Sequence, residues 1–406
     1  MSESQIVNST SEVVAVMTNA LRDPSADVRI RAFQCCNSFV ELQSQDDLEQ
    51  FLPVIPVLVA AIKVSIEDDD NRINPGFEVL EYFIEYHIEM IEKIIPDLVS
   101  FMLAIGADAA HCDISFRSKA LCLIEFIINY KPKTFCKLNL LQRTIDVSLL
   151  VMTEEEDDFS GDDTGSKYGS QLIDTISLHV PPKLCWPIFT KKIAEYIQHP
   201  NPEARKAAIH VIAIIADGCA SLVEENFEDL MKCVLAGFQQ EPQVKQASCI
   251  AIAEFAKNIP DELPPYSEQL VPMLIAGIHD PSDLVRVKSC YAITQVNTIF
   301  SDELMAQIEP LLTRLVELLT DKNPEVQELA VSALSSLVDM AEEKIEPYFN
   351  PIIEIMKKWL TVTDPEHILV RARATECIAS LASAQKQLFL PHFQVCFSFP
   401  PFQKVK

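Results

Sequence analysis

The stretch from 280 to 296, DPSDLVRVKSCYAITQV, constrains the fold of this chain more than any other. Small and apolar residues recur in it at i, i+4, i+8 and i+11, which places them on one stripe of a helix. The members of this stripe are Val285, Ser289, Ile293 and Val296. We expect Asp280 and Pro281 to end the preceding helix and to begin this one, as an aspartate cap and a first-turn proline. Ser289 is small enough to let a neighbouring helix come close.

The same stripe recurs along the whole chain. Its other lead residues are Val28, Phe116, Ala204, Val244, Val326 and Val370. From 204 onward the lead positions are 204, 244, 285, 326 and 370, hence steps of 40, 41, 41 and 44 residues. In most copies a basic residue follows the lead residue, as Arg286 follows Val285, but Gln327 stands there in one copy.

Periods of about 40 to 47 residues, each built from a helix pair, are typical of HEAT and armadillo solenoids. The sequence therefore predicts an all-α fold: a right-handed HEAT-repeat (armadillo-type) α-solenoid of about nine helix pairs. We expect one solenoid domain over residues 1–393 and an irregular C-terminal tail over 394–406. The first helix of the second pair should be bent by Pro53 and Pro56.

An acidic insertion, predicted as a loop over 153–168, separates the two helices of the fourth pair. Its seven carboxylates are Glu154, Glu155, Glu156, Asp157, Asp158, Asp162 and Asp163. So much like charge beside glycine and serine predicts a disordered acidic loop. A solvated insertion without a role remains the alternative. An EF-hand is not indicated, because the regularly spaced ligands and closing glutamate are absent.

The net charge of −26 indicates which partners the chain can attract. Such a surface repels nucleic acid and anionic membranes and attracts basic proteins, although solubility alone could also explain it. The twelve cysteines are scattered and form no CxxC pair, which is typical of reduced thiols in an intracellular protein. The N-terminus lacks the features of a signal peptide. The apolar run from 52 to 62 is too short to cross a bilayer, so we expect no membrane insertion.

No reaction chemistry is apparent in the sequence. It contains no P-loop, GxGxxG, HExxH or GxSxG motif. The eight histidines lie far apart in the chain. We therefore predict a protein that is not an enzyme and that needs no cofactor, catalytic residue or metal ligand.

The acidic insertion, followed by LHVPPKLCWPIF and HPNPEARKAAIHVIAIIADGC, resembles the importin-β (karyopherin-β) superfamily, in its importin-four and importin-five branch. The resemblance extends to about Phe393. It implies a nuclear import receptor that shuttles between cytoplasm and nucleus through the nuclear pore. Its implied partners are basic cargo such as histones or ribosomal proteins, phenylalanine-glycine nucleoporins and the GTPase Ran.

The resemblance further implies that cargo binds on the concave second-helix surface and that Ran-GTP governs its release. The seven loop carboxylates become candidates for a cargo or Ran contact. The chain is similar to a middle segment of such receptors. A different HEAT scaffold, such as a phosphatase regulatory subunit, is the alternative, and the acidic insertion argues against it.

Overall fold

The computed structural model describes residues 10–68, 72–154, 164–361 and 368–393, which form α-helices and 3-10 turns with no β-strand among them. The chain divides into two compact units, Met1–Glu195 (unit 1) and Tyr196–Lys406 (unit 2). The all-α class of stacked helix pairs is confirmed. The single domain over 1–393 and the right-handed course remain predictions, and the tail at 394–406 lies outside the described residues.

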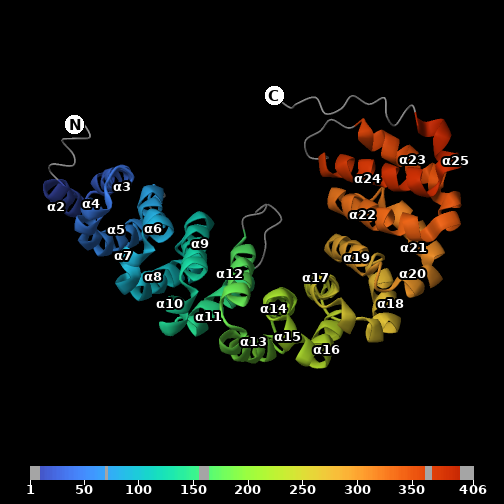
Figure 1. Cartoon of the computed structure of the whole chain (residues 1–406), viewed down its shortest axis with the longest axis horizontal. Helices are drawn as coiled ribbons and strands as arrows, with labels where there is room; N and C mark the ends of the chain where they lie inside the picture. Colours follow the sequence, from blue (N-terminus) through green and yellow to red (C-terminus); the bar gives the residue numbers. More distant parts are fainter. Residues whose placement is uncertain (1–9, 69–71, 155–163, 362–367, 394–406) are drawn as a thin grey trace. The chain divides into compact units, whose positions relative to one another are not determined.

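In unit 1, the stripe-bearing second helices pack side by side in one layer (Figure 1). They are α3 (Ala26–Val40), α6 (Asn74–Tyr86), α9 (Ile114–Tyr130) and α12 (Gly165–His179). The first helices pack against this layer. They are α2 (Thr10–Leu21), α4 (Gln45–Phe51), α5 (Ile55–Glu67), α7 (Ile88–Ile91), α8 (Ile95–Ala107), α10 (Pro132–Lys137) and α11 (Leu141–Met152), and α13 (Pro182–Tyr196) follows α12.

Unit 2 repeats this arrangement. Its second helices are α14 (Pro202–Gly218), α17 (Pro242–Asn258), α19 (Asp283–Val296), α22 (Pro324–Ala341) and α24 (Ile368–Ala384). Its remaining helices are α15 (Ala220–Glu225), α16 (Phe227–Gly237), α18 (Ser267–Gly277), α20 (Ser301–Ala306), α21 (Ile308–Leu318), α23 (Glu346–Leu360) and α25 (Lys386–Phe389).

The described residues hold more helices than nine unbroken pairs would supply, because several first helices are divided in two. The first helices are broken where the prediction had one bent helix. Between α4 and α5, the 3-10 turn Leu52–Val54 contains Pro53, and Pro56 follows it in the first turn of α5. A proline lacks the N–H that would continue the helical ladder, so the break falls where the prolines stand.

Burial of the predicted stripes holds each unit together. Val285, Ser289, Ile293 and Val296 are all at most 1% exposed. The stripes that begin at the other lead residues are buried as well, with one exception. Val28 is 38% exposed, and Ile30 and Phe33 are buried in α3 instead. The predicted stripe of this helix was therefore wrong at its lead residue.

Ser289 admits a close neighbour, as its size predicted. A Cβ atom placed on Gly277 of α18 would lie 2.0 Å from the Ser289 hydroxyl oxygen, which no real side chain could tolerate. The same pairing recurs one repeat earlier, where a Cβ on Gly237 would lie 2.2 Å from the Ser248 hydroxyl. Glycine facing serine thus lets the first and second helices of these pairs approach closely.

The predicted cap of α19 was wrong by two residues. The helix begins at Asp283, and its N-cap is Ser282. Asp280 caps the turn instead, because its Oδ1 accepts a hydrogen bond from the Ser282 N–H at 2.9 Å. Its other carboxylate oxygen binds the Lys245 ammonium at 2.9 Å. The aspartate therefore joins its own turn to the second helix of the preceding pair.

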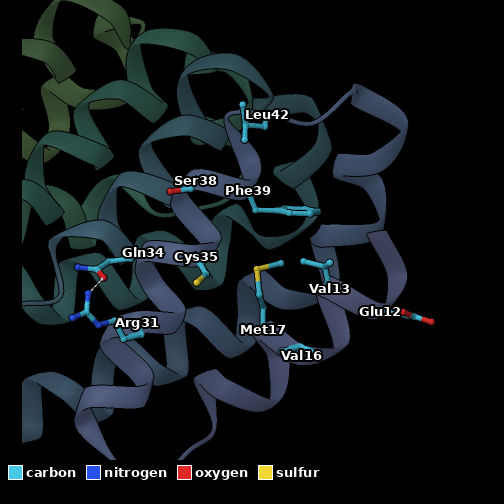
Figure 2. Close-up of a pocket in the computed structure, with 10 residues that line it drawn as sticks. All are labelled: Glu12, Val13, Val16, Met17, Arg31, Gln34, Cys35, Ser38, Phe39 and Leu42. Carbon is cyan, nitrogen blue, oxygen red and sulfur yellow. Dashed lines mark hydrogen bonds between the residues drawn. The ribbon is translucent and has the colours of Figure 1, made fainter. Parts of the chain in front are cut away.

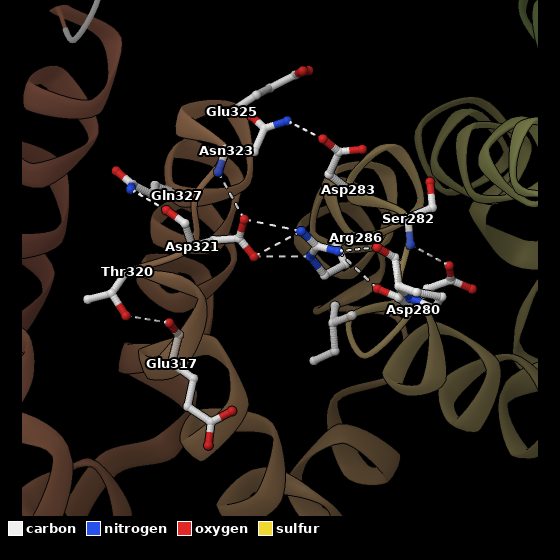
Figure 3. Close-up of polar contacts among 12 residues, drawn as sticks. Asp280, Ser282, Asp283, Arg286, Glu317, Thr320, Asp321, Asn323, Glu325 and Gln327 are labelled. Carbon is white, nitrogen blue, oxygen red and sulfur yellow. Dashed lines mark hydrogen bonds and ion pairs between the residues drawn. The ribbon is translucent and has the colours of Figure 1, made fainter.

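Arg286 makes the corresponding link to the next pair (Figure 3). Its guanidinium donates at 3.1 Å from Nε and from Nη2 to the two oxygens of Asp321. Its Nη1 donates to the carbonyl oxygens of Asp280 and Pro281 at 3.0 and 2.9 Å. One guanidinium, 13% exposed, thus closes its own turn and holds the carboxylate of the following turn.

Further links of this kind connect residues 35 to 39 apart. They are Arg29 to Asp68 and Arg117 to Glu154 in unit 1, and Arg205 to Glu241 in unit 2. We call the whole set the turn ladder. At Gln327 the cation is missing, and the amide donates to the Asp321 carbonyl oxygen at 2.6 Å.

The segment Leu48–Glu67 has the length and hydropathy of a membrane-spanning helix. In the structure it is interrupted by the Leu52–Val54 turn and packs within unit 1. Its residues Phe51, Ile55, Leu58 and Ile62 are at most 1% exposed. This burial is typical of a core helix.

Replacing Arg286 tests the turn ladder. In Arg286→Met, the carboxylate of Asp321, 13% exposed, loses its cation, and we expect unit 2 to lose about 1.5–3 kcal/mol of unfolding free energy. Urea denaturation measures this loss. Arg143→Met, at an exposed position on α11, is the control and should change the free energy by less than about 0.5 kcal/mol.

The loss should also depend on pH. Burial raises the pKa of Asp321, but the Asn323 N–H and Arg286 outweigh it, so this pKa lies below its ordinary value of 3.8. A carboxylate with a lowered pKa contributes stability that is complete above about pH 4 and is lost as pH falls through the lowered pKa. The difference between wild type and Arg286→Met should therefore shrink in that acid range. A difference that stays constant down to the acid limit would contradict this account.

Candidate functional site

Of the seven loop carboxylates predicted as a cargo or Ran contact, only Glu154 belongs to the described residues. Glu155, Glu156, Asp157, Asp158, Asp162 and Asp163 lie outside them. The role of the loop therefore remains a prediction.

Glu154 is held inside the turn ladder. Its Oε2 accepts a hydrogen bond from Arg117 Nη1 at 3.0 Å, and its Oε1 contacts Nη2 of the same guanidinium. Arg117 is 5% exposed and also donates from Nε to the Gly106 carbonyl oxygen at 3.0 Å. At Gly165 of α12, an added Cβ would lie 2.4 Å from Glu154 Oε2. The carboxylate of Glu154 is thus engaged within unit 1 and 29% exposed.

A surface of different character lies on α6 and α9, which are neighbours in unit 1 (Figure 1). On each helix the residues at i, i+3, i+4, i+7 and i+8 face away from the buried side. Their acidic and aromatic members form what we call the acidic–aromatic stripe. It consists of Glu78, Glu81, Tyr82, Glu85 and Tyr86 on α6, and Glu125, Phe126 and Tyr130 on α9.

The α6 part of the stripe contains no lysine or arginine. Tyr86 is 62% exposed and Tyr130 is 48% exposed, and Glu81 and Glu85 of α6 are exposed as well. The ring centroids of Tyr82 and Tyr86 lie 5.3 Å apart, and those of Phe126 and Tyr130 lie 6.5 Å apart. Each helix therefore presents a pair of rings beside carboxylates.

The negative potentials of the two helices overlap. The Glu85 carboxylate raises the pKa of Tyr86, and Tyr130 and Glu81 contribute in the same direction. Burial raises the pKa of Cys122, on α9, to about 11; Glu125 of α9 and Glu81 of α6 add to this rise, and Lys167 of α12 opposes it. Carboxylates of both helices therefore act on the same place between α6 and α9.

The second helices of unit 2 carry charges that are already paired. Lys257 Nζ lies 2.9 Å from Glu254 Oε1 and 5.0 Å from the centroid of the Tyr291 ring. The Tyr291 hydroxyl donates to the same Glu254 oxygen at 3.2 Å. Further pairs join Lys288 to Glu325 at 3.3 Å and Arg373 to Glu328 at 3.6 Å. Basic side chains of the chain itself thus neutralise acids on this surface.

A groove between α2 and α3 has another chemistry (Figure 2). It encloses about 800 Å³ and its walls are mainly apolar, with Val13, Val16, Met17, Phe39 and Leu42 among them. Glu12 is also among its lining residues, as is Arg31, which donates to Gln34 at 2.9 Å. This groove does not match a basic ligand.

Among the described residues, no three His, Cys, Asp or Glu side chains gather closely enough to hold a metal ion. Burial raises the pKa of the Cys249 and Cys290 thiols to about 12, so both stay protonated and unreactive at neutral pH.

Sequence reasoning missed the acidic–aromatic stripe. The predictions from sequence concerned only the apolar faces of the helices. The signal was nevertheless present, because the glutamates and tyrosines of α6 stand at helical spacing opposite Phe77, Leu80 and Phe83, which are buried. Inspecting the polar face of each helix, and not only its apolar face, would have found it.

Comparisons with known proteins agree with this architecture. Residues 261–388 match the family model of the non-SMC mitotic condensation complex subunit 1. The chain is 24% identical over 285 residues to importin-4 of Mus musculus. The aligned region covers 65% of this chain and 26% of that protein. It is 26% identical over 220 residues to the probable importin subunit beta-4 of Schizosaccharomyces pombe, covering 54% and 20%.

Among solved structures, Kap121p bound to Pho4p superposes with a TM-score of 0.76 at 18% identity. The match covers 96% of this chain and 40% of that one. Kap121p bound to Nup53p gives a TM-score of 0.75 with the same coverage.

The fold and these structural neighbours show that the chain is a HEAT-repeat α-solenoid. The importin relatives and this shared fold together support membership of the importin-β superfamily. The chain spans about a quarter of the length of the mouse importin that it matches.

Replacing Glu154 separates its structural role from that of the loop. Glu154→Gln leaves the buried Arg117 guanidinium without its carboxylate, so we expect unit 1 to lose about 1.5–3 kcal/mol of unfolding free energy. Hydrogen exchange across α9 and α11 should report the weakening locally. The matched control is Asp146→Asn, whose 42% exposed carboxylate pairs with Lys192, and it should cost at most about 1 kcal/mol. Equal effects of the two substitutions would contradict the structural role.

Proposed function

We propose that this chain acts as a nuclear transport receptor, or as part of one, and that it binds lysine- and arginine-rich cargo on its second-helix surface. The observation that carries the proposal is the acidic–aromatic stripe, whose α6 acids have no basic residue of their own helix beside them. The net charge of −26 adds long-range attraction for basic proteins such as histones or ribosomal proteins. The protein would shuttle between cytoplasm and nucleus and perform no chemistry.

The relatives support the same function. They are named as importins. Kap121p has been described in complex with Pho4p, with the SUMO protease Ulp1p and with Nup53p. By analogy, we propose that this chain also contacts nucleoporins, including those with phenylalanine-glycine repeats.

The condensation-subunit match suggests a different kind of scaffold, but it spans only 261–388. This region covers α18 to α24, with the lead positions 285, 326 and 370. Shared HEAT periodicity is sufficient to explain it. The importin relatives match a larger share of the chain, which is why we prefer the transport function.

Charge removal on α6 tests cargo binding. We expect a lysine- and arginine-rich peptide to bind, and to bind more weakly as salt rises, because exposed charges are screened beyond about 10 Å at 0.1 M ionic strength. The triple variant Glu78→Gln, Glu81→Gln, Glu85→Gln should weaken binding about tenfold at low salt, since each exposed ion pair is worth about 0.2–1 kcal/mol. Titration calorimetry at two ionic strengths measures both effects.

The control variant makes the same charge change elsewhere. Glu224, Glu225 and Glu228 are exposed in unit 2, on or next to the first helices α15 and α16. Their replacement by glutamine should leave the affinity within about twofold of wild type. If both triple variants lost affinity equally, the net charge alone would explain binding. Binding that ignores salt and both variants would refute the proposal.

We also propose that the acidic loop contacts cargo or Ran, and that Ran-GTP governs cargo release. The informative variant replaces the six carboxylates from Glu155 to Asp163 by amides and keeps Glu154, because Glu154 stabilises unit 1. We expect it to fold normally and to bind peptide, or Ran loaded with a GTP analogue, more weakly, mostly through a slower association rate. Stopped-flow measurements with each partner test this. Unchanged association with both would leave the loop as a solvated insertion.

A further inference from the structure

The aromatic residues of the acidic–aromatic stripe point to the kind of side chain that it binds. Tyr86 and Tyr130 are exposed large hydrophobic side chains, at 62% and 48%. Their neighbours in the stripe, Tyr82 and Phe126, are partly exposed. Acids alone would attract any cation, whereas exposed rings beside acids favour cations that also stack on an aromatic face.

Unit 2 shows a tyrosine and an acid holding a cation together. Lys257 Nζ lies 2.9 Å from the Glu254 carboxylate and donates to the Tyr291 hydroxyl, 5.0 Å from the ring centroid. These residues come from α17 and α19, which are neighbouring second helices. The exposed face of such helices can therefore hold a cation between a tyrosine and a carboxylate.

The stripe of unit 1 has the ring and the carboxylate but not the cation. Among the described residues, no lysine or arginine forms an ion pair with Glu81 or Glu85. Lys131, which follows α9, pairs with Glu89 at 2.7 Å, outside the stripe, and the charge of Lys167 on α12 acts on Cys122 of α9. The carboxylates of Glu85 and Glu81 both raise the pKa of Tyr86, so negative potential gathers at this ring. A cation supplied by a partner would complete the arrangement.

We propose that the acidic–aromatic stripe is a binding site for arginine side chains of an extended basic segment. This inference rests on the proposed function and names its site. The guanidinium groups stack on Tyr82, Tyr86 and Tyr130, and Glu81 and Glu85 supply the opposite charge. A guanidinium is planar and more weakly hydrated than an ammonium group, so it stacks on rings more readily. The stripe therefore prefers arginine to lysine at equal charge.

The geometry suits an extended segment. The acids of α6 stand at i, i+3 and i+7 along one helix face, and α9 lies beside it. One helical turn rises 5.4 Å, and two residues of an extended chain span about 6.6–7.2 Å. Alternate residues of an extended peptide can thus follow successive turns of α6.

The test uses two peptides of identical length and charge, one carrying only arginine and the other only lysine at its basic positions. Fluorescence anisotropy measures their affinity for the full chain at three salt concentrations. We expect wild type to bind the arginine peptide at least threefold more tightly. In the variant Tyr82→Leu, Tyr86→Leu, Tyr130→Leu, the arginine peptide should bind about fivefold more weakly or worse, and the preference should disappear.

The salt dependence separates rings from acids. Leucine keeps apolar bulk and helix propensity but has no π face, so the triple leucine variant should retain the wild-type salt slope. The Glu78, Glu81, Glu85 glutamine variant should flatten that slope for both peptides. Tyr291→Leu is the matched control, because the cation of that ring is the chain's own Lys257, and it should bind both peptides like wild type. Circular dichroism confirms that each variant is folded.

Two results would overturn the inference in distinguishable ways. If basic peptides bind but the arginine and lysine peptides bind equally to wild type and to the triple leucine variant, the stripe does not select arginine and the proposed function stands. If neither peptide binds to wild type, the proposed function fails and this site fails with it.

Discussion

The link on which the described fold depends is the pairing of an arginine or lysine with the carboxylate of the next turn. Arg286 shows it in full, because its guanidinium holds two carbonyl oxygens of its own turn and both oxygens of Asp321. Apolar stripes alone bring helices together without fixing the register of one pair on the next. Directional hydrogen bonds to a charged group supply this register. They also keep these cations out of solvent, so the ladder contributes few free positive charges to the surface.

The period of the stripe was sufficient to predict the class of fold and nearly all of its core. Ile293 and Val296 are buried as expected, and Ser289 does permit the close approach of Gly277. The sequence did not locate helix starts, because Asp280 caps a turn through the same atoms that could have capped a helix. It also did not locate the breaks in the first helices, where a proline bends one helix but ends another. Such choices depend on tertiary contacts that no local pattern encodes.

The candidate site was harder to predict than the fold. The loop carboxylates were selected for their density, yet Glu154 serves the turn ladder through a residue 37 positions away. No feature of the acidic run itself distinguishes Glu154 from the other acids. Only its contact with Arg117 in the folded structure does. The stripe on α6 was overlooked for the opposite reason. Its glutamates are spread over three turns, and only the folded helix brings them to one face beside the rings of α9.

The contrast between the two units gives the net charge a more specific meaning. Acids on the second helices of unit 2 pair with Lys257, Lys288 and Arg373 of the same chain. Part of the negative charge there is therefore neutralised within the chain. Glu81 and Glu85 of unit 1 have no such partner among the described residues. A charge that is neutralised at short range contributes little to attraction at a distance. The binding of basic proteins should therefore depend on which acids lack a cation, and the total of −26 is a poor guide to where a partner is held.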